Sequence, residues 1–241
     1  MNEPTKTKTL TIGGIVPFTA TDYPGHLSAV VFCQGCPWRC AYCHNPHLIP
    51  AKVDPASEPY SWSSFYSWLV TRRGLLDGVV FSGGEPTAQS ALFDAVADVR
   101  ALGFKVGLHT GGAYPRRVAQ LLPHLDWVGL DIKATCEGYG TVTGVDKSGT
   151  PAFETLDRVI ASGVSYEVRT TIHGALTTQT QLILLAQELK NAGATRWVLQ
   201  PFRAEGCDNA DLLGNPSSPL ALNDALLSEL RNVIPDTTVR A

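Results

Sequence analysis

The chain alternates short, continuous apolar segments with segments in which apolar residues recur every three or four positions. A short apolar run predicts a strand buried on both faces, and the longer spacing predicts an amphipathic helix. The expected strands span residues 27–33, 78–81, 105–108, 127–132, 166–172 and 196–200, and a helical segment follows each of them. Because strand and helix alternate at intervals of roughly 30 residues without a long linker, an α/β fold with one parallel sheet is expected.

The helices are expected around residues 62–69, 92–99, 118–122, 153–160 and 182–189, with a last helix beginning after an N-cap at Asn223. The alternating segment from Thr9 to Gly25 predicts a short hairpin or edge strand before the first parallel strand. We therefore expect one domain of residues 1–241, with an N-terminal hairpin extension (1–26), a β/α core (27–202) and a C-terminal loop and helix (203–241). Periodicity alone does not separate an open, doubly wound sheet from a barrel.

Composition narrows the class of protein. Hydrophobic residues make up 44% and charged residues 17% of the chain, which is typical of a globular protein. A net charge of −3 without a basic block argues against direct nucleic-acid binding. The first ten residues lack an apolar signal core, and no apolar run reaches the roughly 18 residues of a membrane span. We therefore expect a cytoplasmic protein, where crowded cysteines indicate a metal rather than disulfides.

Cysteines are crowded in one segment: four of the six lie between Cys33 and Cys43, in C-Q-G-C-P-W-R-C-A-Y-C. A zinc site of four cysteines normally uses two C-x-x-C pairs separated by roughly a dozen or more residues. Only three residues separate Cys36 from Cys40. Iron–sulfur clusters are held by closely spaced thiolates of one loop, so the spacing favours a cluster over zinc or a disulfide pair.

The pattern Cys36-x3-Cys40-x2-Cys43, with Tyr42 before the last cysteine, resembles the signature loop of radical S-adenosylmethionine (SAM) enzymes. The resemblance implies that three cysteines hold a [4Fe-4S] cluster and leave its fourth iron to the methionine moiety of SAM. It also implies that Tyr42 stacks on the adenine, with core packing as the alternative. Cys33 closes an apolar run and is expected to be a buried thiol rather than a fourth ligand.

A second glycine-containing motif, Ser82-Gly83-Gly84-Glu85-Pro86-Thr87, follows the strand at 78–81. A glycine pair lets backbone N–H groups approach a ligand, although a tight strand-to-helix turn explains it equally well. Its place after the cysteine loop is similar to the family's second motif, in which Gly83, Gly84 and Glu85 would meet the amino group of the cofactor.

Asp131 and Lys133 flank Ile132, so on a strand they face one side, toward the interior of a barrel. They could form a buried ion pair that serves only the core. The D-x-K pair also resembles one in the activases of glycyl-radical enzymes. That resemblance implies that the lysine meets the carboxylate of the cofactor, and the aspartate its amino group or ribose.

Polar residues end three further strands. His109 and Thr110 stand where a related activase carries an aspartate and a threonine of a monovalent-cation site, and histidine is a poor ligand for such an ion. His109 is therefore expected to hydrogen-bond the cofactor or to cap its strand. Arg169 and Gln200 could contact the cofactor or the partner, or serve only the fold. Cys136 and Cys207 stand alone and carry no metal-site spacing.

The resemblance covers essentially the whole chain and implies a partial (β/α)6 TIM-type barrel, whose open side admits a large partner. The segments 15–24, 43–46 (C-H-N-P), 108–115 and 126–134 (D-W-V-G-L-D-I-K-A) are similar to activating proteins of anaerobic ribonucleoside-triphosphate reductases. By that likeness, a reduced cluster cleaves SAM to a 5′-deoxyadenosyl radical, which makes a glycyl radical on a partner enzyme. An electron donor such as flavodoxin or ferredoxin is also implied.

Two rival functions stay open. One is a radical SAM enzyme that acts on a small molecule, for example in a deazapurine synthase-like reaction. The other is a non-catalytic iron–sulfur carrier, which would normally give every iron a protein ligand.

Overall fold

A computed structural model describes residues 9–52, 60–214 and 222–240. Eight strands form one sheet in chain order: β1 (Ile12–Thr19), β2 (Ser28–Cys33), β3 (Gly78–Gly83), β4 (Lys105–Thr110), β5 (Trp127–Asp131), β6 (Ser165–Ile172), β7 (Arg196–Pro201) and β8 (Asp236–Val239). β1 pairs antiparallel with β2, and the pairs from β2 to β8 are all parallel. The six expected parallel strands are confirmed as β2 to β7.

The helices also lie close to their expected positions: α1 (Trp62–Val70), α2 (Leu92–Ala101), α3 (Pro115–Leu121), α5 (Gly149–Ser162), α6 (Gln179–Asn191) and α8 (Asp224–Val233). Local caps explain several of their ends. The Asn223 side chain accepts from the Leu226 N–H at 2.9 Å, as expected of an N-cap. Thr178 and Gln181 form a capping box at the start of α6. Two shorter helices, α4 (Tyr139–Thr143) and α7 (Ala210–Gly214), were not expected.

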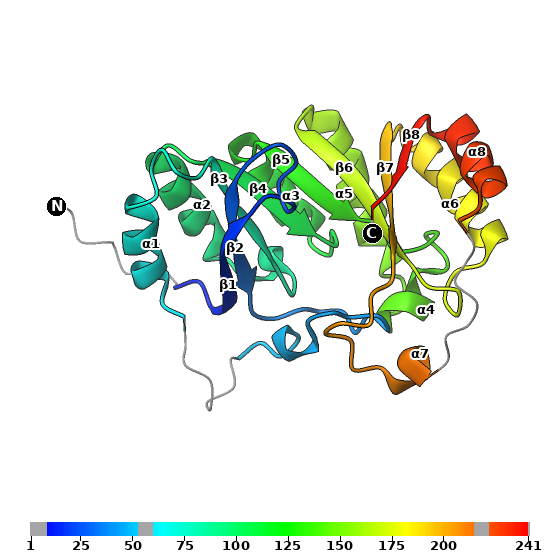
Figure 1. Cartoon of the computed structure of the whole chain (residues 1–241), viewed down its shortest axis with the longest axis horizontal. Helices are drawn as coiled ribbons and strands as arrows, with labels where there is room; N and C mark the ends of the chain where they lie inside the picture. Colours follow the sequence, from blue (N-terminus) through cyan, green and yellow to red (C-terminus); the bar gives the residue numbers. More distant parts are fainter. Residues whose placement is uncertain (1–8, 53–59, 215–221, 241) are drawn as a thin grey trace.

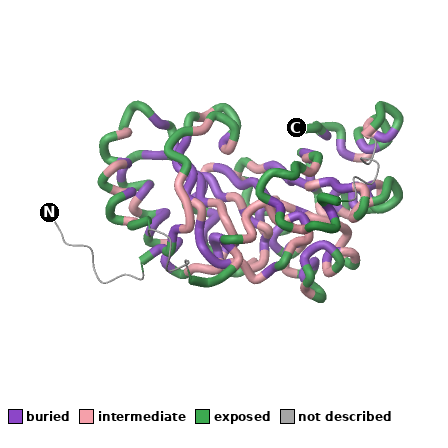
Figure 2. The backbone as a smooth tube through the Cα atoms, turned by 60° about the horizontal axis from the view of Figure 1, so that its bottom comes forward, coloured by how far each residue is buried: buried purple, intermediate pink, exposed green. Residues whose placement is uncertain are grey.

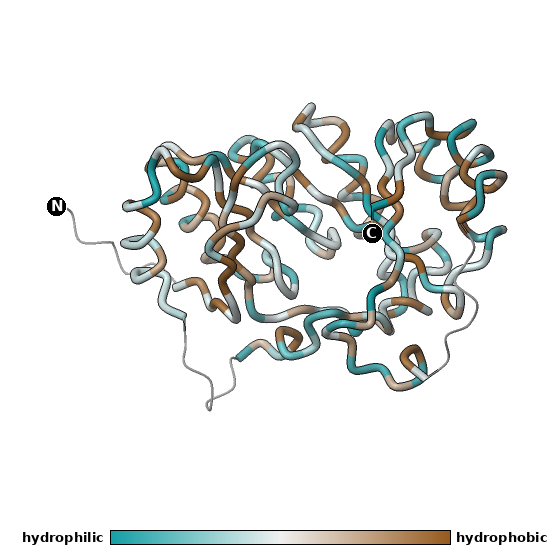
Figure 3. The backbone as a smooth tube through the Cα atoms, in the orientation of Figure 1, coloured by the Kyte–Doolittle hydropathy of each residue, from teal (hydrophilic) through white to brown (hydrophobic). Residues whose placement is uncertain are grey.

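The sheet curves but does not close, because β1 and β8 end its strand order. Figure 1 shows helices on the outside of the curve and the loops that follow the parallel strands gathered at its lower end. This arrangement confirms an α/β partial barrel of the TIM type. Buried positions concentrate along the strands, and exposed positions lie mainly on the outer helices and connecting loops (Figure 2). The strands carry the long hydrophobic stretches (Figure 3).

The C-terminal segment differs from the expected loop and helix, because it ends in β8, a seventh parallel strand beside β7. Its sequence, D-T-T-V, has no apolar run that would predict a strand. The strand depends instead on its neighbour, since Val239 pairs in register with Leu199. Residues 1–8 of the expected N-terminal extension and residues 53–59, which precede α1, lie outside the described residues.

Two aromatic side chains and two valines fill the barrel interior toward the amino-terminal ends of the strands: Tyr23, Val30, Val80 and Trp127. Tyr23 comes from the β1–β2 connection and stacks on Trp127, with 5.6 Å between ring centroids. A side chain at Gly107 would meet this group, because a Cβ there would lie 3.1 Å from Val80. The apolar filling leaves the carboxyl ends of the strands for polar chemistry, as in other β/α barrels. Within the described part of the chain, no helix has the length and apolar character for crossing a membrane.

Candidate active site

The cysteine loop leaves the carboxyl end of β2, and its base is tied to the segment that returns from it. The Gly35 N–H donates to the Leu48 carbonyl at 2.7 Å. The side-chain amide of Gln34 donates to the carbonyl oxygens of residues 47 and 50 at 3.0 and 2.8 Å. Gly35 has a φ of +93°, a left-handed conformation that favours glycine. These contacts fix the direction in which the loop leaves the sheet.

The far arm of the loop is tied to α4. The Arg39 N–H donates to the Thr143 carbonyl and the Ala41 N–H to the Val142 carbonyl, both at 2.8 Å. The carbonyl end of a helix leaves such acceptors unpaired within the helix. Residues on either side of Cys40 are therefore held by a segment about 100 positions further along the chain.

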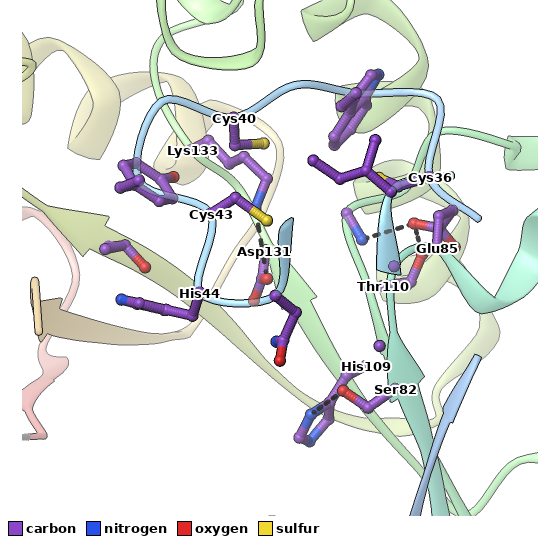
Figure 4. A pocket seen from close by; sticks show the side chains of 18 of the residues that line it. Cys36, Cys40, Cys43, His44, Ser82, Glu85, His109, Thr110, Asp131 and Lys133 are labelled. Carbon is purple, nitrogen blue, oxygen red and sulfur yellow. Dashed lines mark hydrogen bonds and ion pairs between the residues drawn. The ribbon is translucent and has the colours of Figure 1, made fainter. Parts of the chain in front are cut away.

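Cys36, Cys40 and Cys43 line one cavity of about 180 Å³, which we call the cysteine cavity (Figure 4). Among the described residues, no three His, Cys, Asp or Glu side chains converge closely enough to hold a single metal ion. Thiolates of a [4Fe-4S] cluster bind different irons and need not converge on one point. Three thiols around one cavity thus form a donor set that fits a cluster.

The thiols are partly withdrawn from water. Burial raises the pKa of Cys36 to about 12 and also raises the pKa values of Cys40 and Cys43. The free thiols are therefore protonated at neutral pH, and metal binding must displace protons from them. Cys33 is fully buried in the main hydrophobic core and does not line the cavity.

Asp131 and Lys133 lie together on the wall of the cysteine cavity, as expected from their strand positions (Figure 4). The lysine Nζ lies 3.5 Å from Asp131 Oδ2, and Arg169 Nε donates to Asp131 Oδ1 at 2.9 Å. Burial opposes ionisation of the aspartate, but Arg169 and Lys133 together lower its pKa below the ordinary value. The wall therefore carries an ionised carboxylate between two cations.

Lys133 is cationic. Burial disfavours its charge, but Tyr42 and Asp131 beside it raise its pKa well above the ordinary value. A fixed cation and a fixed carboxylate on one wall suit a zwitterionic ligand such as the methionine moiety of SAM.

Glu85 is almost completely buried, at 2% exposure, and its carboxylate joins the turn after β3 to the turn after β4. It accepts from the Thr110 hydroxyl through both oxygens at 2.8 and 2.9 Å, from the Gly111 N–H at 2.9 Å and from the N–H and hydroxyl of Thr87. Burial nevertheless raises its pKa above the ordinary value. This part of the predicted glycine motif therefore fixes the cavity wall through its side chain.

The glycines of that motif allow the two loops to come together. Gly83 has a φ of +111°, and a Cβ on it would lie 2.4 Å from the Cys33 nitrogen. A Cβ on Gly84 would lie 2.4 Å from the Gly35 carbonyl oxygen. Both glycines also line the cysteine cavity. Their lack of side chains is thus required by backbone packing, and their contact with a cofactor stays a prediction.

Tyr42 and His109 both line the cavity but have protein neighbours of their own. The Tyr42 ring is 5% exposed and packs with Val142 and Leu212, which corresponds to the core-packing alternative. His109 Nε2 donates to the Asp22 carbonyl at 2.9 Å, so its Nδ1 is the atom that accepts from the Ser82 hydroxyl at 3.4 Å. Burial first, and Arg169 second, lower the pKa of His109 to about 3, so the ring is neutral.

Gln200 lies outside the cysteine cavity. It lines an adjacent cavity of about 330 Å³, the side cavity, between the end of β1 and the end of β8. The two cavities share His44, His109, Asp131, Arg169 and Thr171. Thr171 is a register partner of Gln200, and sequence reasoning did not single it out. It lies two positions after Arg169, so strand alternation could have placed both on one face.

Sequence reasoning also missed an ion pair beside the side cavity. Arg240, after β8, donates to both carboxylate oxygens of Glu167 at 2.6 and 2.9 Å. Glu167 is 2% exposed, so its charge is matched by this guanidinium. This ion pair joins β6 to the segment after β8. The two residues are 73 positions apart in sequence, so no local sequence signal reveals the contact.

A family model described as the Radical SAM superfamily matches residues 30–196. A pyruvate formate-lyase-activating enzyme of Clostridium pasteurianum is 34% identical over 199 residues, covering 80% of this chain and 82% of that protein. A Methanocaldococcus jannaschii protein named as a glycyl-radical enzyme activating enzyme is 31% identical over 133 residues, which covers 53% of this chain. The chain spans about half the length of that relative, 52%.

Solved structures show the same fold. SuiB of Streptococcus suis bound to its precursor peptide SuiA has a TM-score of 0.68 at 12% identity, covering 88% of this chain and 48% of that chain. SuiB bound to S-adenosylmethionine has a TM-score of 0.58, at 12% identity, covering 86% and 48%. Members of the matched family use a [4Fe-4S] cluster together with SAM. The matched residues include the three cavity cysteines, Glu85, Asp131 and Lys133, and the chain belongs to the radical SAM superfamily.

Proposed function

We propose that the protein is a radical SAM activating enzyme that generates a glycyl radical on a partner enzyme. The observation that carries the proposal is the cysteine cavity, which combines three thiols with the Asp131–Lys133 pair and shares a wall with a second, polar cavity. The similarity to the Clostridium activating enzyme, over 80% of this chain, supports a glycyl-radical partner. Free thiols suit a reducing compartment, and we place the protein in the cytoplasm.

The three thiols and the Asp131–Lys133 pair of the cysteine cavity have separate roles in this proposal. Cys36, Cys40 and Cys43 would hold the cluster, and Lys133 would bind the carboxylate of SAM. Asp131 would bind its amino group or ribose, since Arg169 leaves the second carboxylate oxygen toward Lys133 and the cavity. When bound, the cluster and SAM supply a one-electron cleavage and the radical that removes a hydrogen atom.

The turn at Gly83, Gly84 and Glu85 would present its backbone to the amino group of the cofactor. Tyr42 would contribute the edge of its buried ring near the adenine. His109, neutral and hydrogen-bonded on both nitrogens, would keep the interior wall in place rather than exchange protons. Both ring nitrogens of His109 are occupied by hydrogen bonds within the protein, so His109 would not bind the alkali ion that the related activase holds at this position.

We place the substrate glycine in the side cavity. A glycine has no side chain, so its recognition must depend on main-chain N–H and C=O groups. Within the described residues, the Thr171 hydroxyl and the Gln200 side-chain amide make no hydrogen bond. Arg169 is paired with Asp131 and Arg240 with Glu167, whereas Asp22 and Arg203 also line the side cavity and form no ion pair among the described residues. Uncharged, unpartnered donors and acceptors suit a peptide main chain.

The finer identity of the partner is also a proposal. Segments 15–24 and 108–115 resemble activating proteins of anaerobic ribonucleotide reductases, which makes that reductase our preferred partner. Some relatives are named as pyruvate formate-lyase-activating enzymes, so pyruvate formate-lyase is the second candidate partner to be tested. Flavodoxin or ferredoxin would supply the electron.

The test is an anaerobic activation assay with reconstituted protein, a reductant, SAM and each candidate partner. We expect 5′-deoxyadenosine together with a glycyl-radical doublet in the electron paramagnetic resonance (EPR) spectrum of the partner. A partner whose substrate glycine is changed to alanine should give no doublet. Cleavage of SAM with turnover of a small molecule and no protein radical would instead support the small-molecule enzyme. A cluster that never cleaves SAM would support the carrier.

A further inference from the structure

The segment that follows β7, residues 202–212, crosses the cysteine loop, and we call it the strap. In Figure 1 it is the orange segment that runs from β7 along the lower end of the molecule to α7, beside the blue cysteine loop. The strap has no part in the family's cysteine motif, and its residues lie beyond the matched region 30–196. Its contacts nevertheless concentrate on the residues between and beside the cluster cysteines.

The first group of contacts involves His44, the residue after Cys43. The Phe202 ring stacks on the His44 ring, with centroids 5.6 Å apart and 19° between planes. His44 Nε2 lies 2.9 Å from the Arg203 carbonyl oxygen, to which it must donate. Gly206 lies against the His44 backbone, because a Cβ added to it would be 2.3 Å from the His44 carbonyl oxygen. A glycine is therefore required where the strap meets the loop.

The second group involves Ala41 and Tyr42, between Cys40 and Cys43. The Asn209 side-chain Nδ2 donates to the Ala41 carbonyl at 3.0 Å. Its Oδ1 accepts from the Asp211 N–H at 3.1 Å, at the start of α7. Leu212, from α7, packs on the buried Tyr42 ring. One asparagine thus joins the helix start to the cysteine loop.

The backbone of Ala41 is held through both its N–H and its carbonyl group. Its N–H donates to the Val142 carbonyl of α4, while its carbonyl accepts from Asn209 of the strap. Both contacts go to the backbone that links two cysteines. They therefore act on the positions of the thiols without touching any sulfur.

We propose that the strap is a positioning element for the cluster, with Gly206 and Asn209 as the positioning residues for Cys40 and Cys43. The strap holds the loop arm against α4 and covers it on the side opposite that helix. A thiolate arm held on two sides retains its irons better than one held on one side, since outer contacts that orient metal ligands commonly change metal affinity by about 10–100-fold.

Two variants test this proposal. Asn209→Asp keeps the oxygen that caps α7 but replaces the N–H donor with a carboxylate oxygen that repels the Ala41 carbonyl. Its matched control is Asn223→Asp, because Asn223 caps α8 in the same way. Gly206→Ala places a methyl group against His44. Its control is Gly163→Ala, since Gly163 has a similar positive φ, +73° against +82°, but nothing within 4 Å of its Cβ position.

The measurement is the rate at which an iron chelator removes the cluster from the reconstituted protein, with the EPR spectrum of the reduced cluster recorded beside it. We expect Asn209→Asp and Gly206→Ala to lose iron about tenfold faster or more, with an altered EPR signal. Both controls should match the wild type. Circular dichroism shows whether each variant folds. If Gly206→Ala does not fold, the result for Asn209→Asp alone tests the proposal. Wild-type rates and spectra in folded Asn209→Asp, or equal loss in the controls, would overturn the proposal.

Discussion

The carboxylate of Glu85 accepts the Thr110 hydroxyl through both of its oxygens, at 2.8 and 2.9 Å. Oε2 also accepts the Gly111 N–H, and no cation balances the buried charge among its hydrogen-bond partners in the described residues. The turn after β3 is thereby attached to the turn after β4. The wall of the cysteine cavity depends on this attachment.

We predict that Glu85→Gln destabilises the protein by about 2–3 kcal/mol. The amide oxygen can replace one carboxylate oxygen, but the amide NH2 then faces the donors of Thr110 and Gly111, and an unsatisfied buried donor costs roughly 1–3 kcal/mol. Urea unfolding of the cluster-free protein measures the change. Glu154→Gln, on the exposed face of α5, is the control and should cost less than about 1 kcal/mol. Equal stability of both variants would contradict the prediction.

Most of the six strands could be predicted because they contain short apolar runs, although β6 also carries Glu167 and Arg169. The cluster loop could be predicted because its cysteines lie close together in sequence. β8 could not, since D-T-T-V depends on pairing with β7 and on the Arg240–Glu167 ion pair. The division of the chain at residues 26 and 202 stays a prediction.

The candidate site was predictable only where its signals are local. Asp131 and Lys133 were expected on one side of an extended segment, and both lie on the cavity wall, although β5 ends at Asp131. Thr110 and Gly111, in contrast, reach Glu85 across about 25 positions, and Asn209 contacts Ala41 across 168 positions. Such contacts arise from the way the β/α units pack, which no short sequence window contains.

Cys33 offers a test of the number of cluster ligands. It is fully buried in the hydrophobic core, whereas the other three loop cysteines line the cavity. We predict that Cys33→Ala keeps wild-type iron and sulfide per chain after reconstitution, at a cost of about 1 kcal/mol in packing. Cys36→Ala, made in the same way, should hold no stable cluster. Loss of iron in Cys33→Ala would make it a fourth ligand and favour an iron–sulfur carrier.

Asp131 is predicted to contribute to cofactor affinity. Its carboxylate is kept ionised by Arg169 and Lys133, and a hydrogen bond to a charged group contributes roughly 1.5–3 kcal/mol. Asp131→Asn should therefore weaken SAM binding about 10–100-fold while the cluster is retained. Anaerobic equilibrium dialysis with labelled SAM measures this, and Asp157→Asn on the outer face of α5 is the control. An unchanged affinity of Asp131→Asn for SAM would mean that the Asp131–Lys133 ion pair serves only the fold.

The last prediction concerns the buried, neutral His109. Its folded-state pKa is about 3, below the ordinary value of 6.5, so an unfolded chain takes up a proton at pH 5.5 that the folded chain does not. The stability from this residue is present above pH 6.5 and falls as the pH decreases toward 3. Between pH 7.5 and 5.5 the free energy of unfolding should fall by at most about 1.4 kcal/mol because of this residue. This limit corresponds to the one pH unit that lies between the unfolded pKa and pH 5.5. His109→Gln keeps a side-chain N–H for the Asp22 carbonyl but cannot titrate, so its free energy of unfolding should lack this part of the decrease.

Urea unfolding of the cluster-free protein at both pH values gives the difference, with His124→Gln as an exposed control that keeps the wild-type decrease. If His109→Gln loses as much stability as the wild type over this range, the buried ring is not the group that resists protonation.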